Sequence, residues 1–170
     1  MHEITQKKNR DLKLLEFQEK LGKLTFLDPA CGSGNFLTEA FLSLRRLENK
    51  VISSLFNGDT VLGFDEFIKV KISQFYGIEI NDFAVTVAKT ALWIAESQMI
   101  AETEKIISQE IDFLPLTTNA FIVEGNALRT DWTTLKPIDS NTLPGVGLFA
   151  GITARVDGSE HRCDCIMGNP

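Results

Sequence analysis

The stretch from Phe26 to Leu37, FLDPACGSGNFL, constrains the fold of this chain more than any other. The apolar run over residues 24–27 predicts a short buried strand, and Asp28-Pro29 ends it because proline cannot continue a ladder of hydrogen bonds. Gly32 and Gly34 then frame a tight turn, and a helix with apolar periodicity follows at once. A strand, a glycine turn and a helix N-terminus bring backbone N–H groups together, so the stretch predicts a ligand pocket.

The residues of the turn narrow the choice of ligand. A dinucleotide fingerprint needs a third glycine, and that position is Leu37; the lysine of a nucleotide-binding P-loop is also missing. Asp28 would repel a polyphosphate. S-adenosylmethionine suits the pocket better, because its carboxylate can accept from N–H groups while its ammonium meets Asp28.

These residues also resemble a known family. Asp28 to Leu37 is similar to motif I of DNA adenine-N6 methyltransferases of the class I S-adenosylmethionine-dependent fold. Further segments resemble the MmeI-like, type IIG restriction–modification enzymes, which join nuclease, methyltransferase and target recognition in one chain. These segments are residues 21–24, 74–80, 91–95, 125–132 and 168–170. The resemblance begins at about Leu14 and is weakest over residues 137–161.

The resemblance implies an α/β, Rossmann-like class I methyltransferase fold, three-layer α/β/α and truncated after about the fourth strand. In that fold the first four strands lie in the order three, two, one, four. We expect a leading helix over residues 1–22 and the cofactor-binding half of a methyltransferase domain over residues 23–170. An apolar strand left at the edge of the sheet would favour self-association.

Local patterns predict the elements themselves. Residues 7–22 form a helix with a stripe of Leu12, Leu15 and either Phe17 or Leu21, packed on the sheet edge. A second helix covers residues 35–55, with Arg45 and Arg46 on its solvated side. A strand over residues 74–80 leads into a helix with Asn81 as its N-cap, and residues 120–123 form a third strand.

Two further positions extend the predicted pocket. Glu79, at the carboxyl end of a strand, can accept both ribose hydroxyls of a nucleoside; the alternative is an exposed strand-end carboxylate. The resemblance gives Asn126 a hydrogen bond to the adenine edge, in competition with a plain Asx-turn. The predicted cofactor-binding residues are Asp28, Pro29, Ala30, Cys31, Gly32, Ser33, Gly34, Asn35, Phe36, Glu79, Ile80, Asn126 and Ala127.

The predicted catalytic residues are Asn169 and Pro170. An apolar strand running into Asn-Pro resembles the start of Asn-Pro-Pro-aromatic, the motif of methyltransferases that act on planar nitrogens. Asn169 and the Pro170 carbonyl would accept the two amino hydrogens and direct the nitrogen lone pair at the methyl group. We expect that these 170 residues alone do not methylate DNA. Related methyltransferases of ribosomal RNA or of protein glutamine, and a non-catalytic nucleoside-binding module, are the alternatives.

Charge and composition restrict the partners. Lys and Arg number 17 against 23 Asp and Glu, a net charge of −6, so we expect DNA to be gripped by parts of the parent protein outside this sequence. No apolar run is long enough to span a membrane, and three irregularly spaced cysteines indicate a reducing, cytoplasmic setting. His161, Cys163 and Cys165 lack a fourth ligand nearby, so we predict no metal site.

Overall fold

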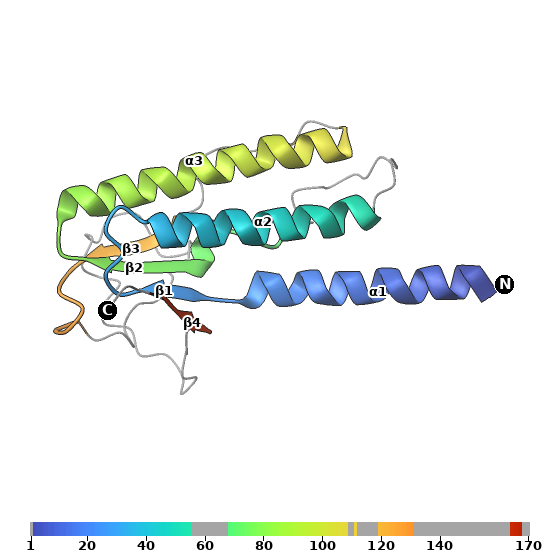
Figure 1. Ribbon diagram of the computed structural model, residues 1–170, viewed down its shortest axis with the longest axis horizontal. Coiled ribbons are helices and arrows are strands. Elements are labelled where there is room, and N and C mark those ends of the chain that lie inside the picture. Colours follow the sequence, from blue (N-terminus) through green and yellow to red (C-terminus); the bar gives the residue numbers. More distant parts are fainter. Residues whose placement is uncertain (1, 56–67, 109–110, 112–118, 131–163, 168–170) are drawn as a thin grey trace, which may run out of the picture.

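The computed structural model describes residues 2–55, 68–108, 111, 119–130 and 164–167. Helices and strands alternate along most of this length (Figure 1). In chain order the elements are α1 (His2–Lys23), β1 (Phe26–Asp28), α2 (Asn35–Leu55), the 3-10 turn η2 (Ile72–Gln74), β2 (Phe75–Glu79), α3 (Asp82–Ile107), β3 (Phe121–Glu124) and β4 (Cys165–Ile166).

The four strands form one parallel sheet in the order β3-β2-β1-β4. This is the order expected for the first four strands. Asp28 of β1 lies opposite Gly77 of β2, and Glu79 of β2 lies opposite Glu124 of β3. The carboxyl ends of β1, β2 and β3 therefore meet at one edge of the sheet, where the predicted pocket should lie.

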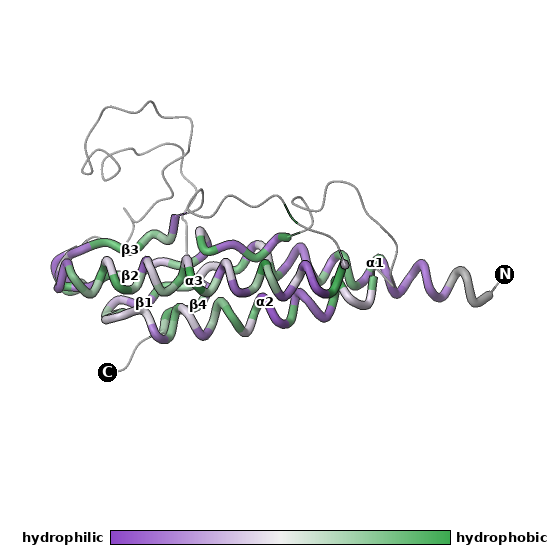
Figure 2. The backbone as a smooth tube through the Cα atoms, turned by 90° about the horizontal axis from the view of Figure 1, so that it is seen from above, coloured by the Kyte–Doolittle hydropathy of each residue, from purple (hydrophilic) through white to green (hydrophobic). Residues whose placement is uncertain are grey.

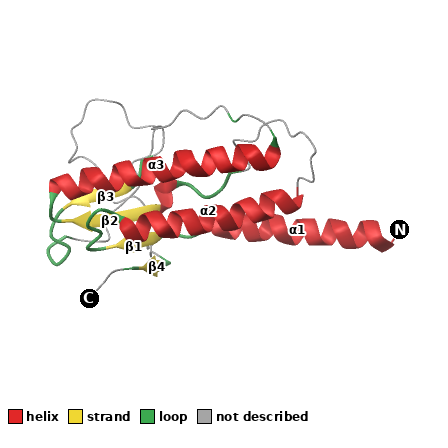
Figure 3. Cartoon of the chain, turned by 45° about the horizontal axis from the view of Figure 1, so that its top comes forward, coloured by secondary structure: helices red, strands yellow, loops and turns green. Residues whose placement is uncertain are grey.

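Helices α2 and α3 cover one face of the sheet (Figures 1 and 3), and the main core lies beneath them. Phe75 stacks on Phe26 at 5.0 Å between ring centroids and meets Phe41 edge-on at 5.7 Å. On the other face Leu27, Tyr76 and Ile78 form a smaller cluster. The described residues thus build the sheet and one helical layer, and they contain no element of the second layer expected for a three-layer fold.

Helix α1 ends one residue beyond Gly22. Its predicted apolar stripe is wrong at Leu12 and Leu15, and of the two alternatives for the third position Leu21 is the buried one. Leu12 is 54% exposed, and Leu15 and Phe17 are also exposed, whereas Gln18 and Leu21 are buried. The reason is that α1 lies beside α2 and runs on past the sheet (Figure 1). On its buried face the Gln18 side chain donates to Glu48 of α2 at 3.0 Å, and Leu21 belongs to the main core.

Helix α2 has the predicted bounds, and Asn81 caps α3 by accepting a hydrogen bond from the Ala84 N–H at 3.2 Å. Hydrophilic and hydrophobic residues are interspersed along both helices (Figure 2). The prediction that Arg45 is solvated is wrong: its side chain is 1% exposed and pairs with Glu48. Arg46 is 52% exposed, as predicted.

Strand β4 pairs only with β1 among the described residues, and Ile166 is 60% exposed. Self-association through this edge stays a prediction. His161, Cys163, Asn169 and Pro170 lie outside the described residues. Within the described part of the chain, no helix is both long and apolar enough to cross a membrane.

Candidate functional site

The turn after β1 has the shape that its glycines allow. Gly32 and Gly34 have φ values of +53° and +78°, which residues with a Cβ rarely adopt. A Cβ on Gly34 would also come within 2.8 Å of the Ala88 Cβ, so a side chain there would push α3 away. The Cys31 N–H donates to the Ile78 carbonyl at 3.1 Å and fastens the turn to β2. The turn thereby starts α2 directly above the carboxyl edge of the sheet.

Asp28 is a buried acid with one oxygen left over. It is 1% exposed, and its Oδ1 accepts a hydrogen bond from the Ala30 N–H at 3.0 Å. Its Oδ2 is buried and has no hydrogen-bond partner among the described residues. Burial raises the pKa of Asp28; the Ala30 N–H opposes the rise and the nearby Glu79 carboxylate adds to it. A buried oxygen in this state fits a cationic or hydrogen-donating ligand.

Glu79 connects the loops that follow β1 and β2. Its Oε2 accepts from the Gly32 N–H at 2.9 Å, and its Oε1 accepts from the Asn81 N–H at 3.0 Å. The Gly32 N–H is therefore already engaged, so the N–H groups in the first turn of α2, which have no acceptor inside the helix, are the better donors for a ligand carboxylate. Each Glu79 oxygen keeps lone pairs for a further donor, because a carboxylate offers about four acceptor positions.

Asn126 forms the Asx-turn named as its alternative role. Its Oδ1 accepts from the Leu128 N–H at 3.0 Å, and its backbone carbonyl accepts from the Arg129 N–H at 2.8 Å. The Gly125 N–H donates to the Glu79 carbonyl at 2.8 Å, so this loop lies against the end of β2. The Asn126 Nδ2 group can still donate to a ligand.

Apolar side chains surround this edge. Phe36 and Ile80, both predicted, are exposed, and so are Phe83 and Leu128, which sequence reasoning missed. Leu128 is 95% exposed. A usable signal was present, since each of the two comes shortly after a strand end: Phe83 lies in the first turn of α3, and Leu128 lies in the Asx-turn.

Cys31 is a packing residue of the turn. Burial raises the pKa of its thiol to about 12, and the Asp28 and Glu79 carboxylates add to the effect. It therefore stays protonated and is no nucleophile. Its Sγ fills the space over Gly77, where an added Cβ would meet it at 2.8 Å.

The fold brings the predicted cofactor residues to one edge of the sheet, on the loops after β1, β2 and β3. Pro29 and Ala30 follow Asp28 directly, Ser33 donates to the Asn35 side chain at 3.3 Å, and Ala127 packs on the smaller cluster. Nowhere among the described residues do three or more His, Cys, Asp or Glu side chains gather as metal ligands. The arrangement offers a carboxylate to a cation, a second carboxylate to hydroxyls and an apolar rim to a flat ring.

Comparison with known proteins places these features in context. The family model described as MmeI, DNA-methyltransferase domain, matches residues 2–170. DNA methyltransferase A of Bacillus subtilis (strain 168) is 40% identical over 157 residues, which is 91% of this chain and 18% of that protein. The adenine-specific methyltransferase PglX of Streptomyces coelicolor is 33% identical over 75 residues, 43% of this chain and 6% of that protein.

A solved structure of the same kind of protein also matches this chain. The type IIL restriction-modification enzyme MmeI, determined in complex with DNA, matches with a TM-score of 0.69 and 39% identity, over 78% of this chain and 18% of that one. The chain therefore spans less than a fifth of the length of the Bacillus protein and of MmeI.

Proposed function

Because the chain belongs to the family of MmeI DNA-methyltransferase domains, we propose that it binds S-adenosylmethionine for transfer of a methyl group to the N6 amino group of adenine in DNA. The supporting observation is the buried Asp28 Oδ2, which has no partner among the described residues and lies beside a glycine turn. The Streptomyces relative is named an adenine-specific methyltransferase, which favours adenine as the target.

The described residues fit this cofactor. Its ammonium would pair with Asp28, and its carboxylate would accept from N–H groups at the start of α2. Glu79 would accept from the ribose hydroxyls while keeping its bonds to the Gly32 and Asn81 N–H groups. Ile80, Phe36 and Ala127 would contact the apolar parts, with the Asn126 Nδ2 group as a donor. When bound, S-adenosylmethionine supplies an electrophilic methyl group on its sulfonium.

The amine is the other half of the reaction. An exocyclic amine on a purine is a poor nucleophile, because its lone pair is delocalised into the ring. Asn169 and the Pro170 carbonyl would accept its two hydrogens and favour a pyramidal nitrogen whose lone pair is free to attack. We expect the surface that grips the DNA to lie mainly outside these residues, since their net charge is −6.

Two measurements on the whole gene product test the proposal. Calorimetry should show binding of S-adenosylmethionine and none of NAD. Transfer of a labelled methyl group to unmethylated DNA, followed by digestion and mass spectrometry, should yield N6-methyladenine. Asn169→Ala should bind the cofactor normally and lose transfer by on the order of 100-fold, as when an electrostatic contact to a transition state is removed.

The same assay separates the alternatives. Labelled methyl groups found in RNA or in protein glutamine, and not in DNA, would identify that molecule as the substrate. Binding of the cofactor without transfer to any of these would indicate a non-catalytic nucleoside-binding module. Binding of NAD in place of S-adenosylmethionine would contradict the proposal at its first step.

A further inference from the structure

Two residues 139 positions apart join the amino ends of β1 and β4. The Thr25 N–H donates to the Asp164 Oδ2 at 2.8 Å, and the Thr25 hydroxyl donates to the same oxygen at 3.0 Å. In return the Asp164 N–H donates to the Thr25 hydroxyl oxygen at 3.2 Å. The threonine hydroxyl thus acts as donor and acceptor in one reciprocal pair, and the two bonds to a carboxylate are charge-assisted.

Among the described residues, little hydrophobic burial of β4 is present to fix its register. The register of a strand is usually set by which of its side chains are buried. In β4, however, Cys165 and Ile166 are both exposed, and only Met167, just beyond the strand, packs partly against the main core. The ladder itself is short: the Cys165 N–H donates to the Thr25 carbonyl and the Met167 N–H to the Leu27 carbonyl.

The Thr25–Asp164 pair is compatible with one register. The structure pairs Phe26 with Cys165 and Leu27 with Ile166. A slip by one residue would move Asp164 about 3.3 Å along β1 and turn its side chain to the other face. All three hydrogen bonds between Thr25 and Asp164 would then be lost, because such bonds need about 3 Å.

We propose that Thr25 and Asp164 are positioning residues for methyl transfer: they lock the register of β4, whose last residue, Ile166, comes three residues before Asn169 in the sequence. The Met167 N–H bonds the Leu27 carbonyl at 2.7 Å, which places the end of β4 one residue from Asp28. Thr25 and Asp164 lie at the opposite ends of these strands and touch neither Asp28 nor Glu79 in any described hydrogen bond. The inference rests on the proposed function, in which Asn169 holds the target amine.

The kinetic test uses the whole gene product with Asp164→Ala, Thr25→Val and Thr25→Ser. A misplacement of about 1 Å can cost on the order of 100-fold in rate, so we expect kcat for methyl transfer to fall roughly 10- to 100-fold in Asp164→Ala. Thr25→Val should fall less, since the Thr25 N–H still reaches the carboxylate, and Thr25→Ser should keep the wild-type rate. The dissociation constant for S-adenosylmethionine should be unchanged in all three.

Thr90→Val is the matched control. It removes a hydroxyl that donates to the Thr86 carbonyl inside α3, which joins no two strands. Its kcat should equal that of the wild type. A fall in kcat as large as that of Thr25→Val would show that loss of any threonine hydroxyl bond is enough, and would overturn the positioning role.

Hydrogen–deuterium exchange supplies a readout that needs no activity. The peptide carrying Cys165 and Met167 should exchange faster in Asp164→Ala and in Thr25→Val than in the wild type. Unchanged exchange overturns the proposal, and so does faster exchange with an unchanged kcat. If the wild type transfers no methyl group to DNA, the proposed function fails. The positioning role in methyl transfer then fails as well, although faster exchange in the variants would still show that the pair fixes the register of β4. If Asp164→Ala does not fold, Thr25→Val decides both measurements.

Discussion

Two of the buried carboxylates among the described residues, Asp28 and Glu48, lie in very different surroundings. Both residues are almost fully covered, with exposed fractions of 1% and 0%. Glu48 pairs with Arg45 and also accepts from the Gln18 side chain at 3.0 Å and from the Lys69 N–H at 2.6 Å. Asp28 accepts only from the Ala30 N–H among the described residues. Glu48 has its cation within the chain, whereas Asp28 has no cation partner in the part of the chain that the structure describes.

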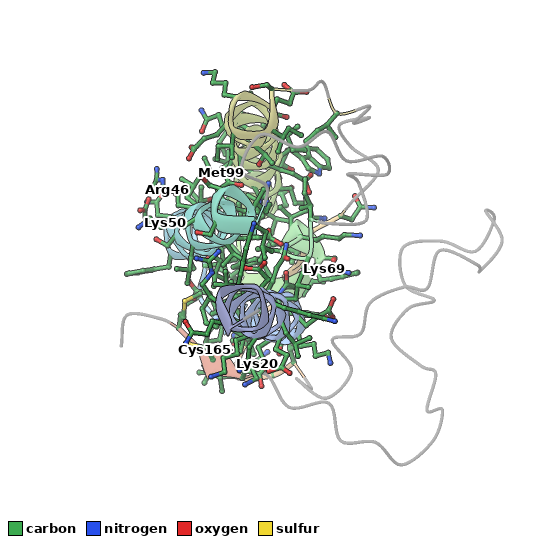
Figure 4. The ribbon with its side chains drawn as sticks, turned by 90° about the vertical axis from the view of Figure 1, so that its right-hand side faces the viewer. Lys20, Arg46, Lys50, Lys69, Met99 and Cys165 are labelled. Carbon is green, nitrogen blue, oxygen red and sulfur yellow. The ribbon has the colours of Figure 1, made fainter. Side chains whose placement is uncertain are left out.

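The surroundings of Glu48 extend into a network between helices. Arg45 donates to the Thr103 hydroxyl at 2.8 Å, and Thr103 donates to the Asn49 Oδ1 at 2.8 Å. The network therefore ties α1, α2 and α3 together. Figure 4 shows the contrast with Arg46 and Lys50, which point outward from α2. A buried charge is costly unless it is paired. We infer that Glu48 stabilises the fold and that Asp28 binds a ligand.

The largest expected effect is a loss of stability when the cation that pairs with Glu48 is removed. Arg45→Met should lower the free energy of unfolding by about 3–5 kcal/mol, because Glu48 would stay buried without its cation. Urea denaturation measures this. Arg46→Met is the matched control: its 3.7 Å pair with Glu39 is exposed, so the loss should be under about 1 kcal/mol. Equal effects of the two substitutions would show that the buried network adds no more than a surface pair.

The second expected effect is on the site. Asp28→Asn keeps an oxygen for the Ala30 N–H and removes a buried charge, so the ligand-free protein should be at least as stable as the wild type. The affinity for S-adenosylmethionine should fall on the order of 10- to 100-fold, the equivalent of one hydrogen bond to a charged group. Calorimetry and urea denaturation of the same preparation check both. A loss of stability as large as that of Arg45→Met would remove the distinction between the two acids.

Local signals in the sequence predicted much of the fold. The bounds of α2, the Asn81 cap and the strand order follow from a glycine turn, from apolar periodicity and from a family resemblance. The buried network was missed, although a signal existed. Leu37, Phe41, Arg45, Glu48 and Ile52 are spaced by four, four, three and four residues and share one face of α2. A charged residue on such a face is taken as solvated until its partners are known, and Gln18 and Thr103 are distant in sequence.

The candidate site also has one part that the sequence could predict and one part that it could not. The position of Glu79 at a strand end could be predicted, because a single strand and a single cap define it. Its bond to the Gly32 N–H could not, since it joins loops 47 residues apart that meet only once β1 and β2 pair. Sequence therefore predicts which residues reach the edge of the sheet, and the fold decides which of their hydrogen bonds are already in use.

The smallest expected effect is a pH dependence of stability that comes from Asp28. The pKa of Asp28 is raised above its ordinary value of 3.8, so at pH values between 3.8 and the raised pKa the folded state holds a proton that the unfolded state has lost. Stability from this group is thus greatest at low pH and falls as the pH rises through the raised pKa. Unfolding measured against pH should show this slope in the wild type and not in Asp28→Asn. Affinity for the cofactor ammonium should change in the opposite direction, rising with pH as Asp28 ionises. If both quantities rose together, Asp28 would already have a cation partner in the folded chain, and its role as the ligand's carboxylate would fail.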